Sequence, residues 1–134
     1  MATSKVEYLG QLSTKLTHLR SGKEIITDAP VDNNGKGQAF SPTDLVSTAL
    51  CSCMMTLMGM YAERAEIDIT SMTAEITKNM ASNPRRIAEV IIEFDMSGIT
   101  ATEKERIKLE RAALTCPVAL SLSPELKQVV NFNY

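Results

Sequence analysis

The sequence predicts an α+β fold built as a single domain over residues 1–134. Three observations support this class. Short strand-like runs precede residue 28, a long apolar helical segment covers Leu45–Tyr61, and alternating apolar residues return after it. The expected order is three strands, a long helix, two strands, two helices and a final strand. A chain of this length can bury one substantial core.

The first elements are short. Strands are expected at Lys5–Tyr8, Gln11–Leu19 and Glu24–Thr27, with turns at Leu9-Gly10 and Ser21-Gly22. The following segment, residues 29–40, is rich in proline, asparagine and glycine, so a loop is expected there.

A long central helix should begin directly after this loop. Ser41 is a good N-cap, Pro42 suits the first helical position, and Asp44 can complete a capping box. The helix should run to about Glu66, roughly 37 Å. Its centre is apolar on nearly every face, which predicts burial on most sides. Because hydroxyl side chains interrupt the apolar run, we expect a core helix and not a membrane span.

The second half should contain a hairpin, two helices and a strand. Alternation from Ile67 to Ile76 and again over Val90–Met96 predicts two strands, joined by a turn at Asn83-Pro84. A capping-box pattern at Thr100-x-x-Glu103 predicts a charged helix that runs to about Thr115. Pro117 then predicts the start of a shorter helix, and a strand is expected at Lys127–Asn133.

Composition narrows the possible functions. The net charge is −2 and no basic run exceeds Arg85-Arg86, so neither a nucleic-acid nor a membrane partner is expected. The polar N-terminus lacks the apolar stretch of a signal peptide, and three cysteines suit a reducing compartment, so the cytoplasm is expected. With one histidine and the close Cys51-x-Cys53 spacing, no metal site is expected.

Two cysteines carry the strongest chemical signal. Cys53 lies within the long apolar run, and Cys116 immediately precedes Pro117, where a new helix should start. A buried cysteine often acts only as a small apolar residue, and this is how we interpret Cys51. Cys53 and Cys116, each placed in a distinctive setting, instead favour a redox-active pair.

The motifs around these cysteines resemble one known family. Phe40-Ser41-Pro42-Thr43-Asp44-Leu45, a thiol nine residues after Asp44, and Cys116-Pro117-Val118 are similar to the osmotically inducible protein C and organic hydroperoxide resistance (OsmC/Ohr) family. The resemblance implies an OsmC-like fold, with mixed small sheets around a long buried helix in an intertwined homodimer. It also implies reduction of small organic hydroperoxides without a bound cofactor, using an external dithiol such as a lipoyl group.

The resemblance also assigns roles to residues. Cys53 matches the attacking cysteine and Cys116 the resolving one, which the start of a helix could assist. A thiol in the middle of an apolar helix needs a nearby cation to ionise. The resemblance implies Arg20 for this role, whereas Arg85 and Arg86 are alternatives from the later hairpin.

Two departures leave the function open. The glutamate that holds the arginine in the hydroperoxidase branch corresponds to Thr43, and the neighbouring Asp44 is expected to serve as a helix cap. His18 is expected to be structural. The sequence therefore predicts a thiol-dependent hydroperoxide reductase. The alternative is a non-catalytic or small-ligand-binding protein in which the cysteines only pack.

Overall fold

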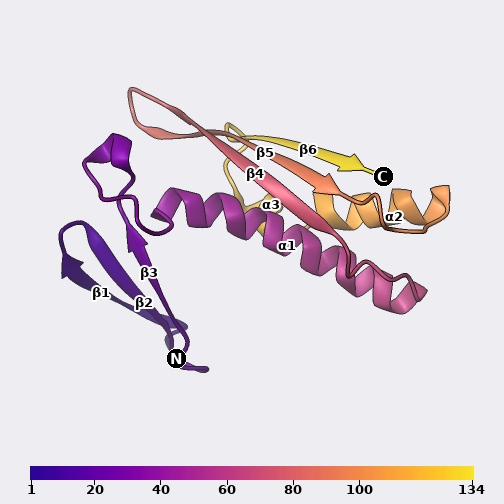
Figure 1. Ribbon diagram of the computed structural model, residues 1–134, viewed down its shortest axis with the longest axis horizontal. Coiled ribbons are helices and arrows are strands. Elements are labelled where there is room, and N and C mark those ends of the chain that lie inside the picture. The colour runs from indigo at the N-terminus through magenta and orange to yellow at the C-terminus, as the bar shows by residue number, and fades with distance from the viewer. The chain divides into compact units, whose positions relative to one another are not determined.

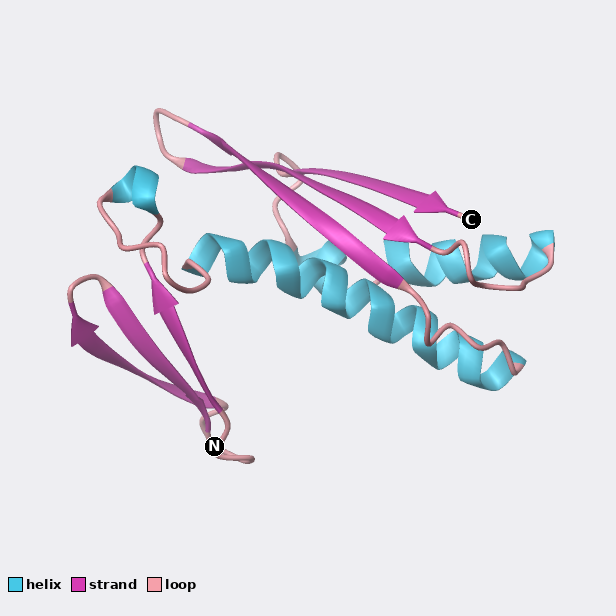
Figure 2. Ribbon diagram, viewed as in Figure 1, coloured by secondary structure: helices cyan, strands magenta, loops and turns pink.

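Two small three-stranded sheets and one long helix form the framework of the protein (Figures 1 and 2). The computed structural model describes all 134 residues, and it confirms the α+β class. The chain divides into two compact units, residues 1–46 and 47–134, each described separately below. The single domain over residues 1–134 therefore stays a prediction. The elements are β1 (Ser4–Gly10), β2 (Ser13–His18), β3 (Glu24–Asp28), the 3-10 helix η1 (Val31–Asn33), α1 (Pro42–Ala65), β4 (Thr73–Ala81), β5 (Arg86–Asp95), α2 (Glu103–Leu114), α3 (Pro117–Ser121) and β6 (Lys127–Asn133).

The first unit contains an antiparallel sheet in the order β1-β2-β3. The turn between β1 and β2 is formed by Gln11 and Leu12, which have φ angles of 53° and 61°. The predicted turn at Leu9-Gly10 is therefore displaced by two residues. Two successive residues in the left-handed region give the turn a twist that matches the twist of the flanking strands. The turn therefore lies at Gln11 and Leu12.

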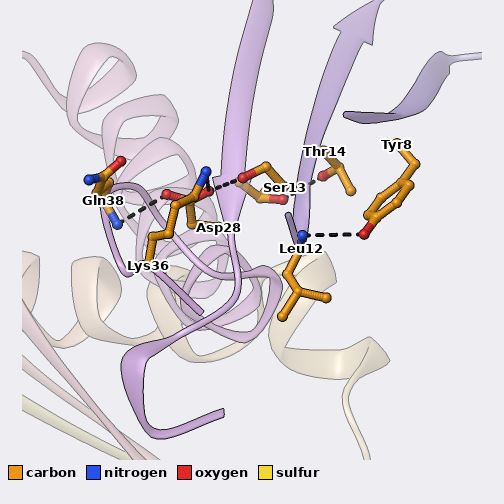
Figure 3. A network of polar contacts seen from close by, with 8 residues as sticks. Tyr8, Leu12, Ser13, Thr14, Asp28, Lys36 and Gln38 are labelled. Atoms are coloured by element: carbon orange, nitrogen blue, oxygen red, sulfur yellow. Dashed lines mark hydrogen bonds and ion pairs between the residues drawn. The ribbon is translucent and has the colours of Figure 1, made fainter. Parts of the chain in front are cut away.

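A buried carboxylate holds the loop that follows β3 (Figure 3). Asp28 is only 4% exposed and accepts hydrogen bonds from the Ser13 hydroxyl and, at 3.1 Å, from the Gln38 backbone N–H. The Lys36 ammonium lies 3.8 Å from the same carboxylate. The backbone N–H of Asp28 donates to the Phe40 carbonyl at 3.1 Å, so both ends of the loop are fixed to one residue.

The predicted loop contains one short helical turn, η1, which was not predicted. Gly35 follows it at a point where the backbone folds tightly on itself. A Cβ atom at this position would lie 1.7 Å from the carbonyl oxygen of Ala29, so no other residue fits without moving the chain. The loop thus reaches α1 along a restricted path.

The start of α1 is capped as predicted. The Ser41 hydroxyl accepts a hydrogen bond from the Asp44 N–H at 3.1 Å, and the Asp44 carboxylate accepts one from the Ser41 N–H at 3.0 Å. This reciprocal pair satisfies two backbone donors that the first helical turn leaves without partners. The helix ends at Ala65, one residue before the predicted end.

In the second unit, α1 and α2 lie along one side of the β4-β5-β6 sheet (Figure 1). The inward side chains of β5, Val90, Ile92 and Phe94, are fully buried, as the alternating pattern predicts. Burying one such side chain contributes roughly 1.5–3 kcal/mol. The same core includes apolar residues of both helices, among them Leu50, Met54, Met58, Leu109 and Ala113.

The sheet is mixed, because β5 pairs antiparallel with β4 and parallel with β6. A parallel pair needs a crossover connection, and α2 with α3 provides it between β5 and β6. Phe94 and Phe132 stand opposite each other in the parallel register and stack with 5.3 Å between ring centroids. The prediction of small sheets is confirmed, but only this one is mixed, since the sheet of the first unit is antiparallel throughout.

Two predicted boundaries in this unit are wrong. The strand after α1 begins at Thr73 and not at Ile67, because the segment before it forms a turn in which the Asp68 carboxylate accepts the Thr70 N–H at 2.9 Å. Ile67 and Ile69 pack against the core from this turn, which produced the misleading alternation. The second helix is capped by Thr102 with Glu105, two residues beyond the predicted pair.

Only one face of α1 is buried within the single chain. Leu50, Met54 and Met58 are fully buried, whereas Met60 is 53% exposed and Val46 is 39% exposed. The predicted burial on most sides is therefore not achieved by one chain alone. By length and mean hydropathy α1 could also cross a membrane, but core helices share both properties, so this is weak evidence.

The Asp28 network predicts a pH-dependent stability. The Ser13 hydrogen bond lowers the pKa of Asp28, opposed by burial and assisted by the Gln38 N–H and Lys36. A lowered pKa stabilises the fold above the unfolded-state value of about 3.9, and this contribution disappears as the pH falls through the folded-state value. Asp28→Asn should therefore lower the melting temperature at pH 7, with a difference from wild type that shrinks in acid.

Thermal unfolding followed by circular dichroism from pH 7 to pH 2.5 measures this difference. Glu24→Gln removes an exposed carboxylate from the same strand and should leave the melting temperature near the wild-type value. A constant Asp28→Asn deficit at every pH would contradict the prediction.

Candidate active site

Helix α1 presents its two cysteines to different surroundings. Cys53 is partly buried and packs at the edge of the core of the second unit. Cys51 is 3% exposed, and burial raises the pKa of its thiol to about 11. Two residues advance a helix by about 200°, so the side chains point to different sides. Cys51 thus has the surroundings of a packing residue, and Cys53 those of an accessible thiol.

Cys116 lies at the junction between α2 and α3. It is completely buried and is the N-cap of α3, where its sulfur accepts a hydrogen bond from the Ala119 N–H at 3.4 Å. Its carbonyl accepts the Leu120 N–H at 3.1 Å. Pro117 occupies the first helical position, where a missing N–H has no cost. The sulfur is therefore held by the backbone geometry of a helix start.

The thiols of Cys53 and Cys116 are neighbours. Burial is the main cause that raises the pKa of Cys116, and a hydrogen bond and charge interaction with Cys53 raise it further. The N–H groups of Ala119 and Val118 act in the opposite direction, but they do not prevail. The helix start therefore assists Cys116 less than the sequence suggested, because desolvation in the core outweighs it.

The two backbone N–H groups that act on the Cys116 sulfur, those of Ala119 and Val118, were not predicted from the sequence. Backbone groups carry no residue signature, and only the Cys116-Pro117 pair indicated a helix start at this point. Gln128 was also missed. Its side-chain amide donates to the Ala119 carbonyl at 3.0 Å and so ties α3 to β6.

Arg20 belongs to the first unit, whereas both cysteines belong to the second. It is exposed in the turn that joins β2 to β3, where the predicted Ser21-Gly22 turn is present and Gly22 has a φ of 74°. His18 forms a 2.6 Å hydrogen bond with Ser21 in the same turn. The role of Arg20 toward Cys53 stays a prediction.

The alternative cations lie in the turn between β4 and β5. The Arg86 guanidinium donates to the carbonyls of Pro84 at 2.9 Å and Ser82 at 3.3 Å, so this side chain stabilises its own turn. Arg85 precedes it in the same turn. At the start of α1, Thr43 forms a 3.2 Å hydrogen bond with the Ser41 hydroxyl. No group of three histidine, cysteine, aspartate or glutamate side chains is arranged to hold a metal ion.

Comparison with known proteins identifies the family. Residues 35–130 match the family model described as OsmC-like protein, which covers more than half of the chain and includes both cysteines of the candidate pair. No curated protein matches the chain at a significant level.

Solved structures show the same fold. A Psychrobacter arcticus protein, described as a candidate osmotic stress induced and detoxification response protein, is 51% identical and has a TM-score of 0.93, with 99% of this chain and 96% of that one covered. More distant similarity extends to the organic hydroperoxide resistance protein OsmC of Legionella pneumophila, at 14% identity, a TM-score of 0.75 and coverages of 100% and 98%. A candidate organic hydroperoxide resistance protein of Vibrio cholerae, with captopril in one of its active sites, has 15% identity, a TM-score of 0.73 and coverages of 99% and 92%. At these low identities the last two comparisons show only a shared fold.

The different exposures of the three thiols predict an order of alkylation. In the native protein at pH 7, iodoacetamide should modify Cys53 first, because Cys116 and Cys51 are buried and have raised pKa values. Peptide mass spectrometry over a time course measures the order, and the same reaction in guanidinium chloride should remove the difference. Faster modification of Cys51 than of Cys53 would contradict the assignment.

Proposed function

Because the chain belongs to the OsmC-like protein family, we propose that it reduces small organic hydroperoxides with Cys53 and Cys116 as a redox pair. The main observation in support is the pairing of a partly buried thiol with a fully buried one beside it in the same core. An attacking thiol needs access to substrate, whereas a resolving thiol needs access only to the attacking one.

In the first step the Cys53 thiolate attacks the distal oxygen of the hydroperoxide. An S–O bond forms and the O–O bond breaks, so the sulfur is oxidised to a sulfenic acid. The alkoxide that leaves takes up a proton and departs as an alcohol. Leu57, one turn further along α1, is also a partly buried apolar residue, and it suits the organic part of such a substrate better than the more polar hydrogen peroxide.

In the second step the Cys116 sulfur attacks the sulfenic acid. An S–S bond forms, the S–O bond breaks, and hydroxide leaves with a proton as water. Burial raises the pKa of Cys116, and the Ala119 N–H that donates to its sulfur acts in the opposite direction, so this amide would help the thiol to give up its proton in this step. An external dithiol completes the cycle by two exchanges, which leave it as a disulfide and restore both cysteines.

We assign Arg20 as the cation that favours the Cys53 thiolate. One feature of the chain supports it over the later hairpin. The Arg86 guanidinium is committed to carbonyl groups of its own turn. Thr43, which stands where the resemblance implies a glutamate, cannot hold a guanidinium by an ion pair.

The alternative is a non-catalytic or small-ligand-binding protein, and the threonine at position 43 favours it. In that case Cys53 and Cys116 would remain thiols in the presence of a hydroperoxide. Three free cysteines suit either function in a reducing compartment, and we place the protein in the cytoplasm.

The protein should work as a homodimer that covers the apolar surface one chain leaves exposed. Exposed apolar side chains lie on the outer face of α1 and on the sheet of the first unit. They include Met60, Val46, Val6, Tyr8 and Ile25. So much exposed apolar surface is unusual for a stable monomer, and a second copy of α1 would bury part of it.

Intact-mass spectrometry tests the redox pair directly. After one equivalent of cumene hydroperoxide, the wild-type protein should lose two hydrogens as the disulfide forms. Cys53→Ser should abolish peroxide consumption. Cys116→Ser should permit one turnover and leave Cys53 as a sulfenic acid or a higher oxide.

Cys51→Ala is the matched control, because it removes a neighbouring thiol that the proposal does not use. It should retain nearly the full rate. Equal losses in the Cys51 and Cys53 variants would overturn the assignment, and an unchanged wild-type mass would favour the binding protein.

The homodimer predicts a concentration-dependent stability. The midpoint of chemical unfolding should rise with protein concentration, as expected when folding and association are coupled. Met60→Lys should weaken the dimer in native mass spectrometry, because the charge would be buried without a partner. Ile107→Lys changes an equally exposed residue on α2, 53% in both cases, and should leave the dimer intact. A folded monomer with a concentration-independent midpoint would exclude this assembly.

A further inference from the structure

Strand β6 carries a polar side chain at a position where its pattern calls for an apolar one. Gln128, Val130 and Phe132 alternate along the strand, so they share the side that faces the helices. Val130 and Phe132 pack against the core, and Gln128 stands opposite the fully buried Val90 of β5. An amide in such surroundings costs stability unless it is hydrogen-bonded. The glutamine at this position therefore calls for a specific partner.

That partner is the last turn of α3. The Gln128 side chain is partly buried, and its Nε2 donates to the Ala119 carbonyl at 3.0 Å. The last carbonyls of a helix have no partner within the helix, and Gln128 satisfies one of them. Helix α3 has only five residues and none of them is fully buried. Because so short a helix is not stable by itself, contacts with the rest of the chain have to hold it in place.

Ala119 is held on two sides, and one of them is the candidate resolving thiol. Its N–H donates to the Cys116 sulfur at 3.4 Å, while its carbonyl accepts from Gln128. The position of this sulfur is therefore connected to β6 through a single residue. A disulfide forms only within a narrow range of sulfur–sulfur distances and dihedral angles. A small displacement of α3 would thus slow the formation of a bond between Cys116 and Cys53.

We propose that Gln128 is a positioning residue, which holds α3 so that the Cys116 sulfur is directed at the sulfenic acid of Cys53. The inference rests on the proposed hydroperoxide reduction and concerns its second step alone, in which the S–S bond forms, the S–O bond breaks and water leaves. Gln128 acts through Ala119 and is not a catalytic residue. All four residues belong to the second unit of the chain.

Single-turnover kinetics of the full-length protein separate the two steps. Disulfide formation is followed by quenching and intact-mass spectrometry at increasing concentrations of cumene hydroperoxide. At low concentration the rate rises with peroxide and reports the attack by Cys53, whereas at high concentration it reaches a plateau set by Cys116. Gln128→Met, which keeps the length of the side chain and suits an apolar face, should lower the plateau by roughly tenfold, as expected for a misplaced reacting group. The initial slope should stay unchanged.

Two further variants distinguish the hydrogen bond from the packing of the strand. Gln128→Glu keeps the shape of the side chain, but at pH 8 its carboxylate can only accept hydrogen bonds, so the plateau should fall at least as far. This variant also serves if Gln128→Met does not fold. Asn131→Leu is the matched control, because it removes a 2.7 Å hydrogen bond from another β6 amide, to the Glu93 carboxylate, at an exposed position. Both the slope and the plateau should be retained.

Alkylation reports the position of α3 without any peroxide. In the reduced protein, Gln128→Met should raise the rate at which iodoacetamide modifies Cys116, because a less firmly held α3 exposes this buried thiol more often. The rate at Cys51, which is buried in α1, should not change and provides the internal reference. An unchanged rate at Cys116 would show that Gln128 does not hold α3, and the inference would be wrong.

The kinetic outcomes separate this inference from the proposed function. If the wild-type protein forms no disulfide with the hydroperoxide, the proposed function fails and the inference fails with it. If the wild type forms the disulfide and the Gln128 variants reach the same plateau, only the positioning role is overturned. Equal losses in slope and plateau would also overturn it, since the substitution would then affect the whole site and not the second step.

Discussion

The parallel pairing of β5 with β6 is the constraint on which the candidate site depends. Two parallel neighbours cannot be joined by a tight turn, so the chain has to cross the sheet between them. In this protein the crossing consists of α2 and α3, and it lies on the side of the sheet that α1 also covers. The junction of the two crossover helices contains Cys116, and in this way a residue far along the chain becomes a neighbour of Cys53.

The two neighbouring thiols are not equivalent, and the difference comes from their supporting elements. Cys53 belongs to a continuous helix, whose backbone amides are already used in hydrogen bonds along the helix. Cys116 caps a new helix, where the Ala119 amide is available to its sulfur. Burial and the proximity of Cys53 nevertheless raise the pKa of Cys116, so the amide at the start of α3 favours the thiolate and the surrounding core opposes it.

Features determined by neighbouring residues were predictable from the sequence, and features determined by distant ones were not. Ser41 and Asp44 identified the start of α1 because a capping box is local. The next capping box was predicted two residues too early, since Thr100 and Thr102 both have a glutamate three residues later and the local pattern does not distinguish them. The contact between Cys53 and Cys116 required the crossover. The settings of the two cysteines suggested a pair and the resemblance to a family assigned their roles, whereas the bond between His18 and Ser21 had no signal in the sequence.

Complete burial of Cys116 determines the direction in which the proposed disulfide can be reopened. A reducing dithiol has to approach one of the two sulfur atoms in line with the S–S bond, and of the two residues only Cys53 is partly exposed in the single chain. The mixed disulfide should therefore form on Cys53, with Cys116 expelled as the leaving group. A thiol of raised pKa leaves slowly, so the amide at the start of α3 would help in this step by receiving the departing sulfur. In the proposed cycle α3 would therefore act during regeneration and not during the attack on the peroxide.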